Sequence, residues 1–267
     1  MPSPRILLTL AIMISVVCRA QQPAALENQI ADVLARMASK EVATRNAALE
    51  NLIAVIAEGH QLGFDPAYGD VLATFLKRHA AQADRVKLGL IDLLNRGNDA
   101  FVNASPVPAI YTENDSEHYA ISIEMVASLN DERAIPALVG AMTTGGMATR
   151  GLLKYGDKAL GPVLGELNNP NPLVRGSAFR TGIEILKIKN DAVSHARVLG
   201  MIRAAIVDQT SLIRDNALWA IERLAPEDQG QFLAVLQEMA QGDPFFNSDH
   251  YPLRDRARNL LEMVAKR

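Results

Sequence analysis

The fold of this chain is decided by a short stretch of sequence, Asn171-Pro172-Leu173-Val174-Arg175-Gly176-Ser177-Ala178. It consists of a turn with Asn and Pro, then an apolar residue, a base and, three positions after the base, a small residue. The same pattern returns as Ser211-Leu212-Ile213-Arg214-Asp215-Asn216-Ala217 and as Pro252-Leu253-Arg254-Asp255-Arg256-Ala257. A unit that recurs along a chain in this way predicts a repeat architecture.

Each copy opens an amphipathic helix, because apolar or small residues follow the base with the 3.6-residue period of a helix face. One further copy has Tyr119 in place of the base. We interpret the bases as structural, since a residue that recurs with the repeat can bond to acids or carbonyls of the neighbouring repeat's turn. Steps of roughly 25 to 45 residues between copies suit helical pairs joined by variable loops. The basic positions are Arg45, Lys87, Arg150, Arg175, Arg214 and Arg254.

A second helix follows in each copy. The segment Asp131-Glu132-Arg133-Ala134-Ile135-Pro136-Ala137-Leu138 predicts a turn and then a helix with Pro in its first turn, where a missing N–H costs little. We expect such helices near 66–79, 134–143, 159–167, 192–207 and 227–240, and we expect them to line a concave face. One pair cannot bury its apolar stripe alone. The pattern therefore predicts an all-α fold, an α-solenoid of stacked antiparallel helical pairs.

These segments resemble HEAT repeats, and the Asp-Glu-Arg-Ala-Ile-Pro-Ala-Leu segment resembles the subtype first described in phycobilisome lyases. The resemblance extends over 41–267 and is strongest over 118–143 and 171–224. It implies a helical-repeat fold. It implies little about activity, because this scaffold serves many unrelated tasks.

The first 20 residues differ from the rest of the chain. Arg5 precedes an uncharged, mostly apolar run over 6–17, and Cys18-Arg19-Ala20 follows. We interpret 1–20 as a secretory signal peptide, which predicts a periplasmic or extracellular protein. The run is shorter than the roughly 20 residues of a membrane span, so no integral span is expected in the mature chain. The alternative is a lipoprotein anchored at Cys18, although Val17 is an unusual neighbour for a lipidated cysteine.

The remainder is predicted to be one domain. Residues 21–40 are expected to form an N-terminal capping helix, and 41–267 the helical repeats. An irregular loop is predicted over 97–115, which contains Pro106 and Pro108. A loop of that length in a compact protein is usually functional or disordered.

The charge balance argues against nucleic-acid binding. Loss of Arg5 and Arg19 would lower the number of bases from 27 to 25 against 30 acids, a formal charge of −5. A surface that neutralises phosphates needs the opposite sign. Because Cys18 is the only cysteine, the mature chain is expected to have no disulfide, thiol nucleophile or thiolate metal site.

Motifs for catalysis, metal binding or cofactor binding are not found in the sequence. The five histidines form no His-Glu-x-x-His motif. Gly145-Gly146 is not followed by the Lys of a phosphate loop, and no Gly-x-Ser-x-Gly elbow occurs. We therefore expect a protein that is not an enzyme and that carries no metal or cofactor.

Two features are candidates for partner binding. At about 100° per residue, Trp219 lies opposite the apolar stripe of its helix, and Arg180 stands at the equivalent place in the preceding copy. Trp219 either anchors a partner, since aromatics concentrate binding energy, or packs on a neighbouring loop, which we slightly favour. The polar stretch 242–252 carries Phe245, Phe246 and Tyr251. These three form either an exposed binding patch or, as we prefer, a lid over the end of the core.

The sequence as a whole predicts an exported, non-enzymatic scaffold that binds a protein or peptide. One alternative is an enzyme similar to the bilin lyases that share the repeat subtype. The signal peptide counts against this alternative, because such lyases would be expected to work on cytoplasmic proteins. The other alternative is a lipid-anchored structural component of the cell envelope.

The small residue of the repeat is expected to allow close approach of neighbouring helices. Ala178→Leu or Ala217→Leu should therefore overpack the contact and lower the free energy of unfolding by about 1–3 kcal/mol. Urea unfolding of each variant measures this. A variant as stable as the parent would place that alanine off the stacked face.

Overall fold

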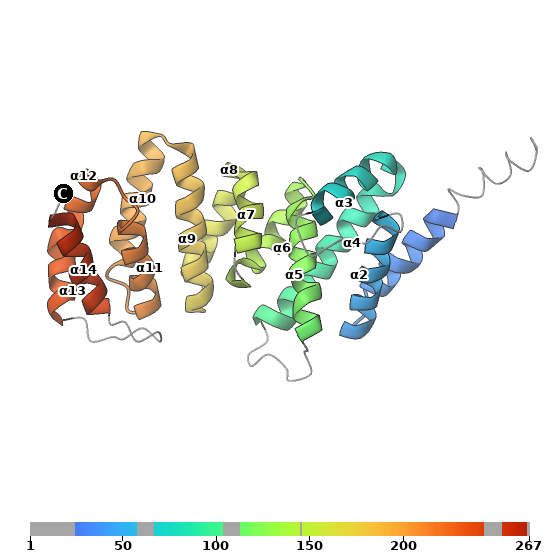
Figure 1. Ribbon diagram of the computed structural model, residues 1–267, viewed down its shortest axis with the longest axis horizontal. Helices are drawn as coiled ribbons and strands as arrows, with labels where there is room; N and C mark the ends of the chain where they lie inside the picture. Colours follow the sequence, from blue (N-terminus) through green and yellow to red (C-terminus); the bar gives the residue numbers. More distant parts are fainter. Residues whose placement is uncertain (1–24, 58–66, 104–112, 145, 243–252, 266–267) are drawn as a thin grey trace, which may run out of the picture. The chain divides into compact units, whose positions relative to one another are not determined.

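The computed structural model describes residues 25–57, 67–103, 113–144, 146–242 and 253–265 (Figure 1). Over these residues all regular secondary structure is helical, and there is no strand. The expected signal peptide, 1–20, lies outside the described residues. No helix in the described part of the chain has the length and apolar character to cross a membrane. The chain forms two compact units, Met1–Ala137 and Leu138–Arg267.

The first unit is built around α5, which packs against α2, α3 and α4. α3 matches the second helix that the sequence predicts near 66–79. The elements of this unit are a helix over 25–37, α2 (Val42–Ile56), α3 (Ala67–Arg78), α4 (Ala80–Asn98), the π-helical turn η1 (Asp99–Asn103), α5 (Glu113–Ala127), the 3-10 turn η2 (Glu132–Ala134) and the start of α6 (Ile135–Gly140).

The helix over 25–37 lies within the range expected for the capping helix, and it buries one face, since Ile30, Val33 and Met37 are at most 3% exposed. It lies against α4, where a Cβ added to Gly89 would collide with Leu34. The burial of this helix therefore depends on its close contact with α4 as well as on the helical spacing of its own apolar residues.

The prediction of an irregular loop over 97–115 is wrong at both ends. The backbone is helical from Gly97 to Asn103 and again from Glu113, and 104–112 lie outside the described residues. Packing explains the difference. A Cβ at Gly97 would stand 2.5 Å from Cδ2 of Tyr119, so the glycine allows α5 to approach rather than ending the helix. Tyr119 Oη also donates to Oδ1 of buried Asn98 at 2.6 Å.

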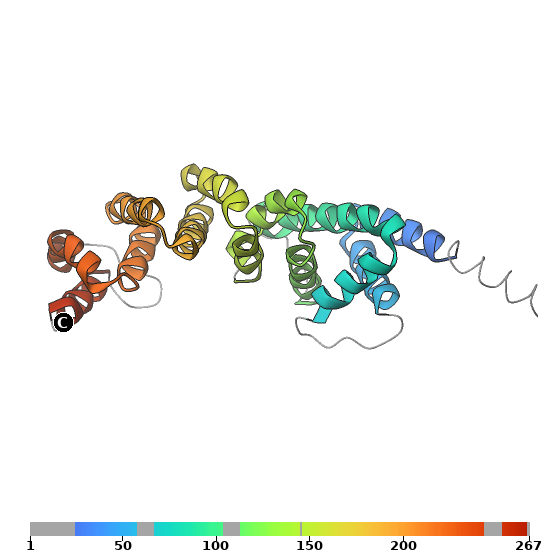
Figure 2. The same ribbon diagram turned by 90° about the horizontal axis from the view of Figure 1, so that it is seen from above.

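The second unit has two rows of helices. In the first row α7 packs on α9, α9 on α11 and α11 on α14, and these helices carry the basic position of the repeat. α8, α10 and α13 pack on that row and match the predicted second helices within a few residues. Figure 2 views several of these helices nearly along their axes, so that both rows can be seen. The elements are η3 (Met142–Thr144), α7 (Gly146–Tyr155), α8 (Asp157–Gly165), η4 (Glu166–Asn168), α9 (Pro172–Lys189), α10 (Ala192–Ala205), α11 (Ser211–Ile221), α12 (Pro226–Gln229), η5 (Gly230–Phe232), α13 (Leu233–Gly242) and α14 (Leu253–Ala265).

The contact between α9 and α11 is close. Ala178 and Ala217 are fully buried. A Cβ at Gly176 would stand 2.5 Å from Nδ2 of Asn216, so no larger residue fits there without movement. Ala196 on α10 is exposed. Ala196→Leu is therefore the matched control for the two overpacking variants.

Three of the repeated bases make the same contact. Nη1 of Arg45, Arg175 and Arg214 donates to the carbonyl six residues earlier, at 3.0, 2.9 and 2.6 Å. These carbonyls belong to the turn that enters the arginine's own helix, where the chain leaves a preceding helix and carbonyls lack helical partners. Arg175 Nη2 also reaches the next turn, donating to Oγ1 of Thr210 at 2.9 Å.

The other positions of the repeat are used differently. Lys87 Nζ lies 3.5 Å from Oδ2 of Asp131, in the turn before η2. Arg150 is exposed. Arg254 lies 3.5 Å from its neighbour Asp255. The bond to the entering turn is therefore shared by Arg45, Arg175 and Arg214, whereas the turns that enter the helices of Arg150 and Arg254 include positions outside the described residues.

The contribution of this hydrogen bond to stability can be tested at two positions that are equivalent in the repeat, Arg214 and Arg150. Arg214 is buried, so Arg214→Met should leave a carbonyl without its charged donor and cost about 1.5–3 kcal/mol in urea unfolding. Arg150→Met removes an exposed base at the same place in another copy and should change stability by less than about 0.5 kcal/mol. Equal losses in the two variants would contradict the structural role of Arg214.

Asp131 fixes the turn before η2. Its Oδ1 accepts from the backbone N of Arg133 at 3.1 Å and from Nε of the same residue at 2.9 Å. The side-chain bonds from Arg133 hold the pKa of Asp131 well below its usual range, although desolvation opposes them. Because the folded pKa is depressed, the carboxylate stabilises the fold above the unfolded pKa of about 4 and loses this effect as the pH falls.

Asp131→Asn keeps the capping oxygen but removes the charge that pairs with Arg133, so it should lower the free energy of unfolding by about 1 kcal/mol at neutral pH. The difference from the parent should shrink as the pH falls below about 4, because Asp131 of the unfolded parent chain then takes up a proton while that of the folded protein does not. Urea titrations along this pH range measure the effect. Asp92→Asn removes an exposed pair with Arg96 and should matter little at any pH. A pH-independent loss in Asp131→Asn would contradict the role of its charge.

Candidate binding site at Trp219

Trp219 lies on the face of α11 that turns away from the core. α11 begins at Ser211, and its buried face includes Ile213, Ala217 and Ile221. At about 100° per residue, Trp219 lies on the opposite side of the helix from these positions, and its side chain is half-buried. The position agrees with the sequence, which placed Trp219 opposite the apolar stripe.

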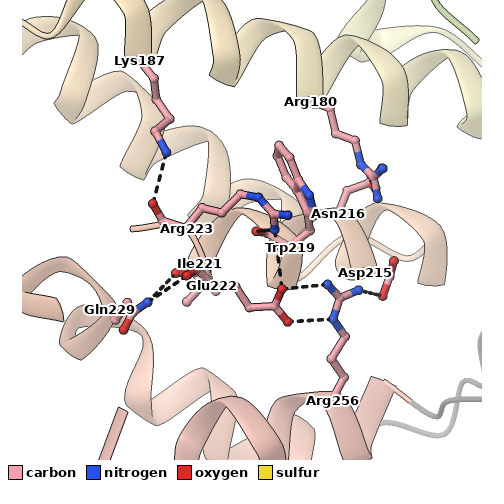
Figure 3. Close-up of polar contacts among 10 residues, drawn as sticks. All are labelled: Arg180, Lys187, Asp215, Asn216, Trp219, Ile221, Glu222, Arg223, Gln229 and Arg256. Atoms are coloured by element: carbon pink, nitrogen blue, oxygen red, sulfur yellow. Dashed lines mark hydrogen bonds and ion pairs between the residues drawn. The ribbon is translucent and has the colours of Figure 1, made fainter. Parts of the chain in front are cut away.

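Two arginines flank the indole of Trp219 (Figure 3). The guanidinium carbon of Arg180, on α9, lies 5.1 Å from the ring centroid. That of Arg223, one turn after Trp219, lies 4.5 Å from it. A cation over an indole face is worth about 0.5–2 kcal/mol. The contacts of Trp219 in the described structure are thus with cations from α9 and its own segment, whereas the sequence favoured a neighbouring loop.

Hydrogen bonds hold this cluster in place. Arg180 Nε donates to Oδ1 of Asn216 at 2.6 Å. Arg223 Nη1 donates to the carbonyl of Trp219 at 3.1 Å. Lys187 Nζ, on α9, donates to the carbonyl of Arg223 at 3.1 Å. We call Arg180, Lys187, Trp219 and Arg223 together the Trp219 site.

Acidic residues beside the site are paired with Arg256 of α14. Arg256 bonds to Asp215 and places Nε and Nη2 3.0 and 3.1 Å from the carboxylate of Glu222 (Figure 3). These bonds join α14 to α11. Desolvation lowers the pKa of Arg180 despite the nearby Asp215, and the like charges of Arg256 and Arg223 lower it further. Because the site contains three cations while Asp215 and Glu222 beside it are engaged by Arg256, it has an excess of positive charge.

An apolar cavity of about 320 Å³ adjoins the Trp219 site between α9 and α11. Its one acidic lining residue is Glu184, which is half-buried. Ile188 is 65% exposed at its rim, which is unusual for a large apolar side chain. The cavity is lined by Leu153, Ile183, Glu184, Lys187, Ile188, Trp219, Ala220, Arg223 and Leu224.

A smaller cavity of about 160 Å³ shares Lys187, Arg223 and Leu224 with the first. It contains a pair that the sequence did not reveal, His195 Nε2 at 3.1 Å from Oδ2 of buried Asp228. A carboxylate can orient an imidazole for proton transfer. Among the described residues, no further hydrogen bond of the His195 ring is found.

The first unit contains its own polar cluster, between α2 and α5. His118 is buried, and its Nε2 lies 2.9 Å from Oε1 of Glu50. Asn46 Nδ2 donates to Oδ1 of Asp115 at 2.6 Å. The adjoining cavity of about 20 Å³ is large enough for a single water molecule and no ligand. Within the described ranges, no group of three His, Cys, Asp or Glu side chains is placed to hold a metal ion.

The structure thus brings together two of the five candidate partner-binding residues, Trp219 and Arg180. The other three, Phe245, Phe246 and Tyr251, lie outside the described residues. Sequence reasoning missed Arg223 and Lys187. Arg223 had a detectable signal, because it stands four positions after Trp219 and so shares its helix face.

Comparison with known proteins identifies no relative: no protein-family model matches the chain, and no curated protein matches it.

Proposed function

We propose that this protein is a non-enzymatic scaffold that binds a protein or peptide partner through the Trp219 site. The observation that carries the proposal is the indole of Trp219, held between Arg180 and Arg223 at the edge of an apolar cavity of about 320 Å³. Trp and Arg are the residues most enriched among those that dominate binding energy. Here both are positioned before any partner arrives, which reduces the entropic cost of binding.

The proposal includes the repeat architecture that the sequence predicts, a HEAT-like α-solenoid of stacked antiparallel pairs. The consecutive packing of α7, α9, α11 and α14 supports it within the second unit. A solenoid offers an extended surface formed by one helix from each repeat.

The surface proposed here differs from the one expected from sequence. The second helices were expected to line the binding face, whereas Arg180 and Trp219 belong to α9 and α11, in the row that carries the repeated base. The contacts between successive repeats run along this row. The proposal therefore assigns the partner to the first row.

Export is also part of the proposal. It is supported by Arg5 and by the uncharged run over 6–17. An exported scaffold would meet its partner in the periplasm or outside the cell.

The tagged full chain can be used to capture its partner from the native host, with mass spectrometry to identify the bound protein and the N-terminus of the bait. Trp219→Ala should reduce recovery of the partner at least about tenfold, since it removes a central aromatic anchor. An N-terminus at Gln21 would support export, whereas one at Cys18 would indicate the lipoprotein.

Arg203→Gln is the matched control, because Arg203 is an exposed arginine 5.9 Å from the ring of Phe232 on the other row. It should recover the partner like the parent. Thermal melts verify that both variants are folded. Equal recovery by folded Trp219→Ala and by the parent would refute the proposed function.

A further inference from the structure

The cations of the Trp219 site have few anionic partners of their own. Among the described residues, Arg180 hydrogen-bonds only to the amide of Asn216, and Lys187 only to the carbonyl of Arg223. Arg223 has one carboxylate, that of its neighbour Glu222, at 3.6 Å. Glu222 is itself bonded to Arg256 at 3.0 Å. Glu184 lines the same cavity and Asp215 lies near Arg180, but among the described residues neither carboxylate bonds to a cation of the site, and Asp215 is engaged by Arg256. Three cations therefore have one directly paired carboxylate, which is already engaged, and one unbonded acid nearby.

These cations still have hydrogen-bond donors to offer. A guanidinium has five N–H groups and an ammonium has three. Arg180 uses Nε on Asn216, so the N–H groups of its two terminal nitrogens have no partner among the described residues. Terminal guanidinium nitrogens suit a carboxylate, which they bind through two parallel hydrogen bonds.

The cavity beside these cations favours an apolar group and not a second charge. Its walls include Leu153, Ile183, Ile188 and the indole of Trp219, which favour an apolar group. Its volume of about 320 Å³ is at the lower limit of ligand pockets, roughly 300–1,000 Å³. It thus suits one or two side chains better than a large cofactor.

We infer that the Trp219 site recognises an acidic peptide segment in which a large apolar side chain is flanked by Asp or Glu. The apolar side chain enters the cavity against Trp219, and the flanking carboxylates pair with Arg180, Arg223 and Lys187. This inference rests on the proposed function and adds the chemistry of the partner.

A nucleic acid fits the site less well, although bases stack on indoles. Affinity for nucleic acid comes from many phosphate contacts. The chain has 27 bases against 30 acids, and the site offers three cations. A single-stranded oligonucleotide therefore serves as a competing ligand in the test.

The test uses the fluorescence of Trp219, the only tryptophan of the chain, in the full-length protein. The probe is the peptide acetyl-Glu-Asp-Phe-Leu-Glu-Asp-amide, which has no tryptophan or tyrosine. We expect a saturable change in Trp219 emission that weakens several-fold as the salt concentration rises from about 0.05 to 0.5 M. A peptide with Lys at the four acidic positions, and one with Ser at Phe and Leu, should each bind at least about tenfold more weakly.

Protein variants separate the contributions of charge. The double variant Arg180→Gln, Arg223→Gln should bind the acidic peptide at least about tenfold more weakly, and this binding should lose most of its salt dependence. Arg203→Gln should bind like the parent. The inference is overturned if the Lys-containing peptide binds equally well, if an oligonucleotide binds more tightly, if Arg203→Gln loses as much affinity, or if no emission change occurs up to about millimolar peptide.

The outcomes also distinguish this inference from the function on which it rests. If capture of a partner depends on Trp219 but the acidic peptide does not bind, the scaffold function stands and the peptide chemistry is wrong. If partner capture does not depend on Trp219, both are wrong.

Discussion

A charged hydrogen bond from a buried or half-buried arginine to the turn before its own helix is the contact on which three of the helix connections depend. Arg45, Arg175 and Arg214 each donate to a carbonyl six residues earlier. A turn between helices leaves carbonyls without helical partners, and burying them unpaired costs free energy. The guanidinium satisfies them with a rigid fork of donors, so the turn keeps one conformation and the next helix leaves in one direction.

Small residues impose the second constraint, because they decide how near two helices can come. In the second unit, Gly176, Ala178 and Ala217 bring α9 against α11. In the first unit, Gly97 does the same for α4 and Tyr119 of α5. Glycine inside a helix costs up to about 1 kcal/mol relative to alanine. Here that cost is offset by contacts that a larger side chain would prevent.

The Trp219 site follows from these two constraints. Arg180 and Trp219 occupy the same place in successive copies of the repeat, so the packing that brings α9 and α11 together also brings these side chains within 5.1 Å. Trp219 itself lies outside the apolar stripe of α11, so a polar or aromatic side chain can stand at this position without disturbing that stripe. Arg256 then engages Asp215 and Glu222 from α14, which leaves the cations near Trp219 with little neutralisation of their charge. A repeat that is structural on one face thus produces a specialised surface on another.

The sequence by itself determined that the described chain is helical and where most helices lie. Three features of the sequence are local: the helical period of its apolar residues, the turn before Pro172 and the turn at Asp131. Local features of this kind are what determine where a helix begins and continues. The sequence also placed Trp219 outside the apolar stripe of its helix. Only the tertiary structure decided that Gly97 continues a helix, and that His195 meets Asp228 and Arg223 flanks Trp219 beside a cavity. These outcomes depend on the distance and register between helices, which are set by packing across the fold and not by the residues of any one segment.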